Sequence, residues 1–161
     1  MNAFLIGLQF LTRISIVRQT VWTEEDFGRS VKFFPAIGAV LGIFYVAIIG
    51  LIIELTDGRF QTLEAAIVFA LTVILTGGIH CDGFMDTFDG LFSGRDRERM
   101  LEIMKDSHVG AFGAVSFITL AIVEFATLEE LTRLPSETFI SAIYAMPVLG
   151  RLMMAQPYLF Q

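Results

Sequence analysis

The chain is poor in cysteine, in positive charge and in polar residues overall. Its single cysteine, Cys81, cannot form a disulfide within the chain, and we interpret it as a small apolar packing residue. Lysine and arginine number 11 against 17 acidic residues, and the net charge of −6 argues against a nucleic-acid partner. Hydrophobic residues make up 55% of the chain and the mean hydropathy is +0.69. Soluble domains are less apolar, so the composition favours an integral membrane protein.

Four uncharged runs predict about four membrane spans. They are Phe33–Ile53, Ala65–Cys81, Val109–Val123 and Thr138–Gly150. The first is long enough to cross a bilayer, and Pro147 and Arg151 mark the inner end of the last. Met1–Thr12 is too short to span and lacks a small-residue cleavage site, so it predicts an interfacial helix and not a secretory signal. We therefore expect an all-α, polytopic helical bundle forming a single membrane domain over residues 1–161.

Positive charge alternates along the chain in a way that predicts the orientation of these spans. Four basic residues precede the first run and four follow the second, whereas the other two loops hold one each. In chain order they are Arg13, Arg18, Arg29 and Lys32; then Arg59; then Arg95, Arg97, Arg99 and Lys105; then Arg133. Because basic loops stay in the cytoplasm, we expect the N-terminus and the Asp82–His108 loop to face it.

Three aspartates follow the second apolar run at a helical spacing. Asp82, Asp86 and Asp89 lie at i, i+4 and i+7, so on a helix their carboxylates share one face, with neighbours about 6 Å apart. At an effective dielectric constant near 20, each neighbouring pair repels by about 3 kcal/mol. A hard divalent cation bound by oxygen ligands is the simplest compensation, which predicts Mg²⁺ or Ca²⁺.

Glycines punctuate the chain close to these positions. Gly77–Gly78 is expected to weaken the second helix just before the aspartates. Gly90 follows Asp89, where it either lets a phosphate or metal approach the backbone or forms a plain turn. Gly38-x-x-x-Gly42 in the first run predicts a close helix contact. Ser93–Asp106 predicts a short amphipathic helix with Ser93 as its N-cap.

Several polar residues nearby are candidates for the same site. Asp106 can complete a metal site from another segment. Arg95 and Arg97 either bind polyphosphate or form a solvated face. His80 is a candidate general base, although its spacing of two residues from Asp82 puts the two on different faces of a regular helix. Glu124, at the end of the third run, is either an intramembrane functional acid or an interfacial one.

The segment from Gly77 to Ser93, continuing through Arg97–Ser107, closely resembles the adenosylcobinamide-GDP ribazoletransferase, or cobalamin synthase, family. Phe10-Leu11-Thr12-Arg13 and Phe34-Pro35-Ala36-Ile37-Gly38 are similar to that family too, so the resemblance spans nearly the whole chain. His80–Gly90 together with Asp106-Ser107 carries the specific part of the signal. Family members are considerably longer, so we expect this chain to be the N-terminal portion of a longer fold.

The resemblance implies a Mg²⁺-dependent transferase of late cobalamin biosynthesis, located in a bacterial or archaeal cell membrane. Its substrates would be adenosylcobinamide-GDP and α-ribazole or α-ribazole 5′-phosphate, and GMP would be released. The matching residues are His80, Asp82, Asp86, Asp89 and Asp106, with the four aspartates as metal ligands and Asp89 or His80 as the base. Arg95 and Arg97 would contact the guanylyl phosphates. The partners would be these substrates and the lipid bilayer, with no nucleic acid, and a homo-oligomer stays open.

Two alternatives remain at this point. CDP-alcohol phosphotransferases also place aspartates at the cytoplasmic ends of membrane helices, but their Asp-Gly-x-x-Ala-Arg signature is not met, because Asp86-Thr87 stands where Ala-Arg would be. A divalent-cation transporter would use the aspartates as its permeation site. Such a path needs polar groups across the bilayer, and Ala65–Leu75 offers only Thr72.

Overall fold

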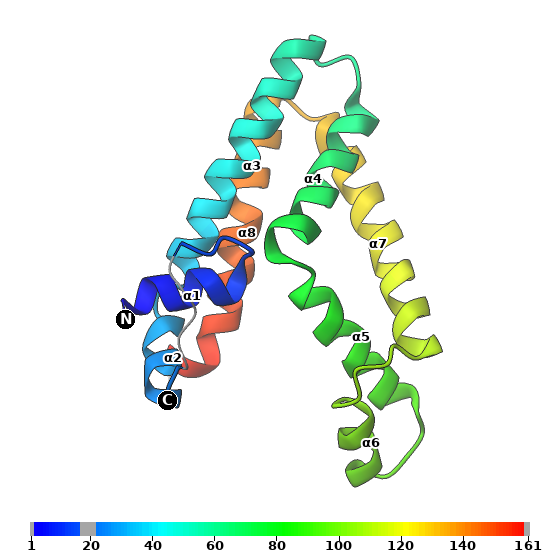
Figure 1. Ribbon diagram of the computed structural model, residues 1–161. Helices are drawn as coiled ribbons and strands as arrows, with labels where there is room; N and C mark the ends of the chain where they lie inside the picture. Colours follow the sequence, from blue (N-terminus) through cyan, green and yellow to red (C-terminus); the bar gives the residue numbers. More distant parts are fainter. Residues whose placement is uncertain (1, 17–21, 160–161) are drawn as a thin grey trace. The chain divides into compact units, whose positions relative to one another are not determined.

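The computed structural model describes residues 2–16 and 22–159, and this part of the chain is helical, with no strand. Figure 1 shows the helices in chain order. They are α1 (Ala3–Leu11), α2 (Glu24–Val31), α3 (Phe34–Thr56), α4 (Gln61–Thr76), α5 (Ile79–Phe92), α6 (Arg97–Ile103), α7 (Ala111–Thr132) and α8 (Ser136–Leu159). The expected all-α class is confirmed. The expectations that involve Met1, Arg18 and Phe160–Gln161 lie outside the described residues.

The chain divides into two compact units. One comprises Met1–Gly77 and Leu128–Gln161, and the other comprises Gly78–Thr127. The first holds α1 to α4 and α8, and the second holds α5, α6 and most of α7. The predicted acidic residues all belong to the second unit. The prediction of a single membrane domain is not tested by this division.

Helices α1 and α2 form an apolar cluster with the ends of α3 and α8. Its buried members are Leu8, Leu11, Val31, Phe34, Ile37 and Ala155. The predicted N-terminal helix is present, and it begins where Asn2 accepts a hydrogen bond from the backbone N–H of Phe4. Helix α2 was not predicted. Its start carries a clear sequence signal, since Thr23 caps the helix by accepting from the N–H of Asp26, and three acidic residues follow Thr23.

Helices α3 and α8 pack closely through two of the three glycines of α3, Gly38 and Gly42, as predicted. A Cβ on Gly42 would lie 2.6 Å from the carbonyl oxygen of Tyr144, and one on Gly38 would collide with the backbone at Pro147. Both glycines are therefore required for the backbones to approach this closely. The buried side chains Ile37, Leu41 and Tyr45 continue the same face of α3.

Helix α8 extends further than the sequence indicated. Pro147 and Arg151 were expected to mark the inner end of the fourth run, but both lie within the helix, which continues to Leu159. Pro147 has no backbone N–H, so α8 loses one hydrogen bond at this position. Packing against α3 compensates for that loss. Arg151 is nine-tenths buried, and arginine is a good helix former, so its charge is no reason for the helix to end there.

The second apolar run is interrupted, so Ala65–Cys81 is not one continuous helix. Helix α4 ends at Thr76 and α5 begins at Ile79, with Gly77 and Gly78 both in the left-handed region at φ values of 66° and 73°. Glycine adopts these values without a steric penalty, so the predicted weak point is confirmed as a helix break. Arg13 fixes the end of α4: its N–H donates to the carbonyl of Leu75 at 2.8 Å and its guanidinium to that of Gly77 at 3.4 Å.

Three helices are long and apolar enough to cross a membrane, namely α3, α7 and most of α8. Helices α4 and α5 qualify together as a fourth, broken span. The predicted number of about four spans therefore holds if the broken pair counts as one. Helix α7 runs to Thr132, beyond the predicted end at Val123, so Glu124 lies inside this helix and not at its end.

Candidate functional site

The three aspartates lie on one helix but in three different environments. All belong to α5, where Asp82 is exposed, Asp86 is half-buried and Asp89 is only 8% exposed. The phenylalanines of the same helix form a separate row, with ring centroids 4.4 Å apart for Phe84 and Phe88 and 5.3 Å apart for Phe88 and Phe92. The face that the spacing predicted therefore exists, and its accessibility falls from its first aspartate to its last.

Asp89 is bound to the start of α7. Its Oδ2 accepts a hydrogen bond from the N–H of Gly110 at 2.7 Å, and its Oδ1 accepts one from the N–H of Gly113 at 2.8 Å. The first N–H groups of a helix have no partner within that helix and carry partial positive charge. The carboxylate of Asp89 therefore satisfies two such donors from a neighbouring helix.

Two glycines make this approach possible. A Cβ on Gly110 or Gly113 would collide with the carboxylate of Asp89, and one on Gly113 would also lie 2.6 Å from the carbonyl oxygen of Met85. The sequence interpretation gave neither glycine a role. Their spacing of three residues at the start of an apolar run was the signal that could have found them.

Gly90 has a structural role that neither interpretation of it anticipated. It lies within α5, where a Cβ would stand 2.6 Å from Cγ of Met104 and 3.1 Å from the carbonyl oxygen of Met100. Gly90 is therefore the point at which the segment around α6 packs on α5. It forms neither a turn nor an open approach for a ligand.

Asp106 lies in the loop between α6 and α7 and pairs with His108. The carboxylate Oδ1 lies 2.6 Å from Nδ1 of His108 and also accepts the backbone N–H of His108 at 3.1 Å. The hydrogen bond to the imidazole, followed by the backbone hydrogen bond, lowers the pKa of Asp106 below its ordinary value. The same carboxylate raises the pKa of His108. The sequence interpretation assigned no role to His108.

His80 is the second residue of α5 and is half-buried. The helix break lies before it, at Gly77–Gly78, so His80 and Asp82 belong to the same regular helix. At a spacing of two residues they lie on different faces. The break therefore does not bring His80 toward Asp82.

Arg95 and Arg97 are exposed at the start of α6. Asp96, and not Ser93, caps this helix, because its side chain accepts from the N–H of Arg99 at 2.9 Å. Asp96 is the better cap here because it directly precedes the first helical residue. Arg99 pairs with Glu102, whereas Arg95 and Arg97 form no ion pair with any described residue.

The four predicted metal ligands do not meet in one cluster. Among residues 2–16 and 22–159, no three His, Cys, Asp or Glu side chains gather closely enough to hold a metal ion. Asp89 is occupied by two backbone donors and Asp106 by His108, so Asp82 and Asp86 remain as the carboxylates available on α5.

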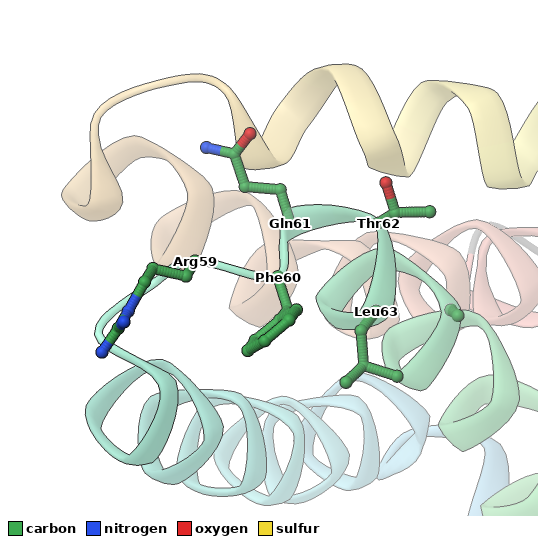
Figure 2. A pocket seen from close by; sticks show the side chains of 6 residues that line it. Arg59, Phe60, Gln61, Thr62 and Leu63 are labelled. Carbon is green, nitrogen blue, oxygen red and sulfur yellow. The ribbon is translucent and has the colours of Figure 1, made fainter.

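A surface hollow lies elsewhere, at the turn between α3 and α4 (Figure 2). It is lined by Arg59, Phe60, Gln61, Thr62, Leu63 and Ala66. Its one charged side chain, Arg59, pairs with Asp57 at 2.5 Å. The hollow contains none of the predicted site residues and no carboxylate, so it offers no metal site.

Sequence comparison extends these observations to known proteins. The chain is 43% identical over 152 residues to the adenosylcobinamide-GDP ribazoletransferase of Desulfitobacterium hafniense. The aligned residues cover 94% of this chain and 58% of that protein. It is 38% identical to the protein of the same name from Fusobacterium nucleatum, over 94% of this chain and 55% of the relative. The chain thus spans little more than half the length of these curated relatives.

No solved structure shows a significant match to the chain. The family model described as cobalamin-5-phosphate synthase matches residues 3–160, and this range includes α5, the loop that carries Asp106 and the glycines at the start of α7. With nearly the whole sequence matched, the chain belongs to the cobalamin-5-phosphate synthase family.

Proposed function

We propose that this chain carries the metal- and phosphate-binding part of an adenosylcobinamide-GDP ribazoletransferase. The observation that carries the proposal is the family match over residues 3–160, which includes the acidic face of α5. Relatives at 37% to 43% identity bear that enzyme name. Because the match is to this family, the CDP-alcohol phosphotransferase alternative loses its support.

The reaction that the name describes is substitution at phosphorus. A ribose hydroxyl of α-ribazole, or of its 5′-phosphate, attacks the phosphorus next to the cobinamide arm of adenosylcobinamide-GDP. A new P–O bond forms, the P–O bond to the GMP phosphate breaks, and the hydroxyl proton passes to a base. Catalysis of such a step depends on positioning and on neutralising the charge of the phosphate oxygens.

Asp82 and Asp86 fit the ligand chemistry of Mg²⁺. They present carboxylate oxygens four residues apart on α5, and Asp82 is exposed. Mg²⁺ usually takes one or two protein carboxylates and completes its shell with water and substrate phosphates, so two aspartates are sufficient. A bound ion would supply charge neutralisation at the pyrophosphate. Asp106 pairs with His108 through Oδ1, so it would contribute through Oδ2, and the assignment of Asp89 as a ligand stays a prediction.

The remaining roles fall to the base and to the arginines. His80 and Asp89 are the two proposed bases. The two N–H donors on Asp89 reduce its capacity to accept a further proton, which favours His80. Arg95 and Arg97 have no acidic partner among the described residues, which leaves their guanidinium groups available to the guanylyl phosphates.

The proposed site opens to the cytoplasm of a bacterial or archaeal cell. The charge alternation between loops supports this orientation. It gives the site access to Mg²⁺ and to both soluble substrates, while the apolar helices lie in the lipid bilayer.

The proposal is tested by GMP release from adenosylcobinamide-GDP and α-ribazole in liposomes. The chain is assayed alone and joined to the remaining part of the Desulfitobacterium hafniense relative, each with Mg²⁺ or with EDTA. Mg²⁺-dependent formation of GMP and a cobalamin product by either form supports the proposal. No product from the joined form, when the relative itself is active, contradicts it.

A further inference from the structure

The loop that carries Asp106 and His108 is attached to α5 at both of its ends, through two adjacent residues. At one end, Met104 packs on Gly90, with 2.6 Å between its Cγ and the position of a Cβ on that glycine. At the other end, the N–H of Gly110 donates to Asp89 at 2.7 Å. Residues 105–109 lie between these two points, so Asp89 and Gly90 together determine where the loop meets α5.

The N-terminus of α7 has no cap of its own. Gly110 directly precedes the helix, and its carbonyl accepts the first helical hydrogen bond, from Ala114 at 3.1 Å. This is the position at which serine, threonine, aspartate or asparagine usually caps a helix, and glycine has no side chain to do so. Asp89 supplies the missing carboxylate from α5, and it does so from a buried position.

We propose that Asp89 is a positioning residue of the transferase site, which caps α7 from α5 and thereby holds the Asp106–His108 loop against the helix that carries Asp82 and Asp86. Both carboxylate oxygens of Asp89 are engaged at 2.7 Å and 2.8 Å, and only 8% of the residue is exposed. Each oxygen keeps a further lone pair, but a base or a metal ligand must also reach the substrate or the ion, and the low exposure of Asp89 restricts that access. The geometry therefore favours the positioning role of Asp89 over its proposed roles as base and as metal ligand.

The first test follows the two capped amides and does not depend on activity. The chain is labelled with ¹⁵N-glycine, placed in lipid nanodiscs, and amide exchange is followed at Gly110 and Gly113. In Asp89→Ala both amides are expected to exchange about tenfold faster, the effect of losing a helix cap. In Asp89→Asn, where only one oxygen can accept, the increase is expected to be smaller. Unchanged exchange at both glycines in both variants overturns the proposal.

A second variant approaches the same contact from α7. Gly113→Ala would place a methyl group against the carboxylate of Asp89 and the carbonyl of Met85, so exchange at Gly110 is expected to rise as in Asp89→Ala. Gly50→Ala is the matched control, since a Cβ there meets nothing within 4 Å. An equal response of Gly110 to both substitutions contradicts the proposal.

The catalytic part of the inference rests on the proposed function and is tested by GMP release from the joined form. A base or a metal ligand keeps more activity as glutamate than as asparagine, because glutamate retains the carboxylate. A cap between two glycines prefers asparagine, which keeps the length of the side chain and one acceptor. Higher activity in Asp89→Asn than in Asp89→Glu supports the positioning role, and the reverse order overturns it. Should the joined form lack activity, the exchange measurement still decides whether Asp89 caps α7.

Discussion

Asp106 and His108 form a pair on an exposed loop, with 2.6 Å between Oδ1 of the carboxylate and Nδ1 of the imidazole. The pair joins a predicted metal ligand to a residue that the sequence interpretation left unassigned. A carboxylate that pairs with an imidazolium cannot bind a cation with the same oxygen at no cost. The protonation state of His108 therefore depends on what Asp106 binds.

We expect the pKa of His108, measured by NMR titration in EDTA, to lie above the ordinary value of about 6.5. The pair loses the imidazolium charge as pH rises through this raised pKa, and it loses the carboxylate charge as pH falls through the lowered pKa of Asp106. It is therefore complete only between the two values. Asp106→Asn should return the pKa of His108 to about 6.5.

Addition of Mg²⁺ to the same sample tests Asp106 as a ligand. If Asp106 binds the ion, the pKa of His108 falls toward its ordinary value because the carboxylate is withdrawn. A His108 titration that Mg²⁺ leaves unchanged, in a sample where Asp82 or Asp86 responds, removes Asp106 from the metal site.

Gly42→Ala should destabilise the contact between α3 and α8. The added methyl group would lie 2.6 Å from the carbonyl oxygen of Tyr144, and the helices must separate to accept it. The expected loss is about 1–3 kcal/mol in unfolding free energy. Unfolding in detergent micelles measures it, with Gly50→Ala as the control of the same residue types in the same helix. Equal stability of the two variants would show that close approach at Gly42 is not required.

Sequence patterns located the helices well where one physical effect dominates. Uncharged length predicted α3, and the left-handed preference of glycine predicted the break at Gly77–Gly78. The pattern failed where the end of an uncharged run was taken as the end of a helix. Arg151 lies inside α8 and Glu124 inside α7, and both residue types are good helix formers, so neither charge ends its helix.

The candidate site was predicted in composition but not in arrangement. The i, i+4, i+7 spacing correctly put three carboxylates on α5. It could not show that Asp89 finds its partners 21 and 24 residues further along the chain, because that contact depends on how α7 packs on α5. The absence of a side chain at Gly110, which makes the distant cap necessary, is visible in sequence only once the start of α7 is known.

Asp82→Asn and Asp86→Asn should each abolish Mg²⁺-dependent GMP release in the form joined to the remainder of the relative. Each substitution replaces one of the two carboxylates available on α5, and the substrate phosphates would then lack their shared cation. Asp57→Asn, in the exposed turn after α3, is the control and should keep the activity of the parent. Turnover near the parent level in either α5 variant would exclude that residue as a required ligand.

Arg95→Ala and Arg97→Ala should raise the KM for the GDP-activated corrinoid and leave kcat less affected. Both guanidinium groups are exposed and lack an acidic partner among the described residues, so their loss removes binding without disturbing the fold. Arg99→Ala is the comparison, because Arg99 already pairs with Glu102. A KM that changes equally in all three variants would indicate a general charge effect and not phosphate contacts.

A reporter enzyme fused after Ser93 should report the cytoplasm. Ser93 directly follows α5 and precedes the basic segment with Arg95, Arg97 and Arg99, and positively charged loops are retained on that side.

A second fusion, after Arg59 in the turn between α3 and α4, should report the opposite side, because α3 is long enough to cross the bilayer. If both fusions report the same side, the broken pair of α4 and α5 does not cross the membrane between Arg59 and Ser93, and if that side is the cytoplasm, α3 does not span either. A fusion after Arg133 tests α7, which must cross between Ser93 and that position if it spans. A cytoplasmic signal at Ser93 and an outside signal at Arg133 would support α7 as a span. The acidic helix would then be accessible to cytoplasmic Mg²⁺.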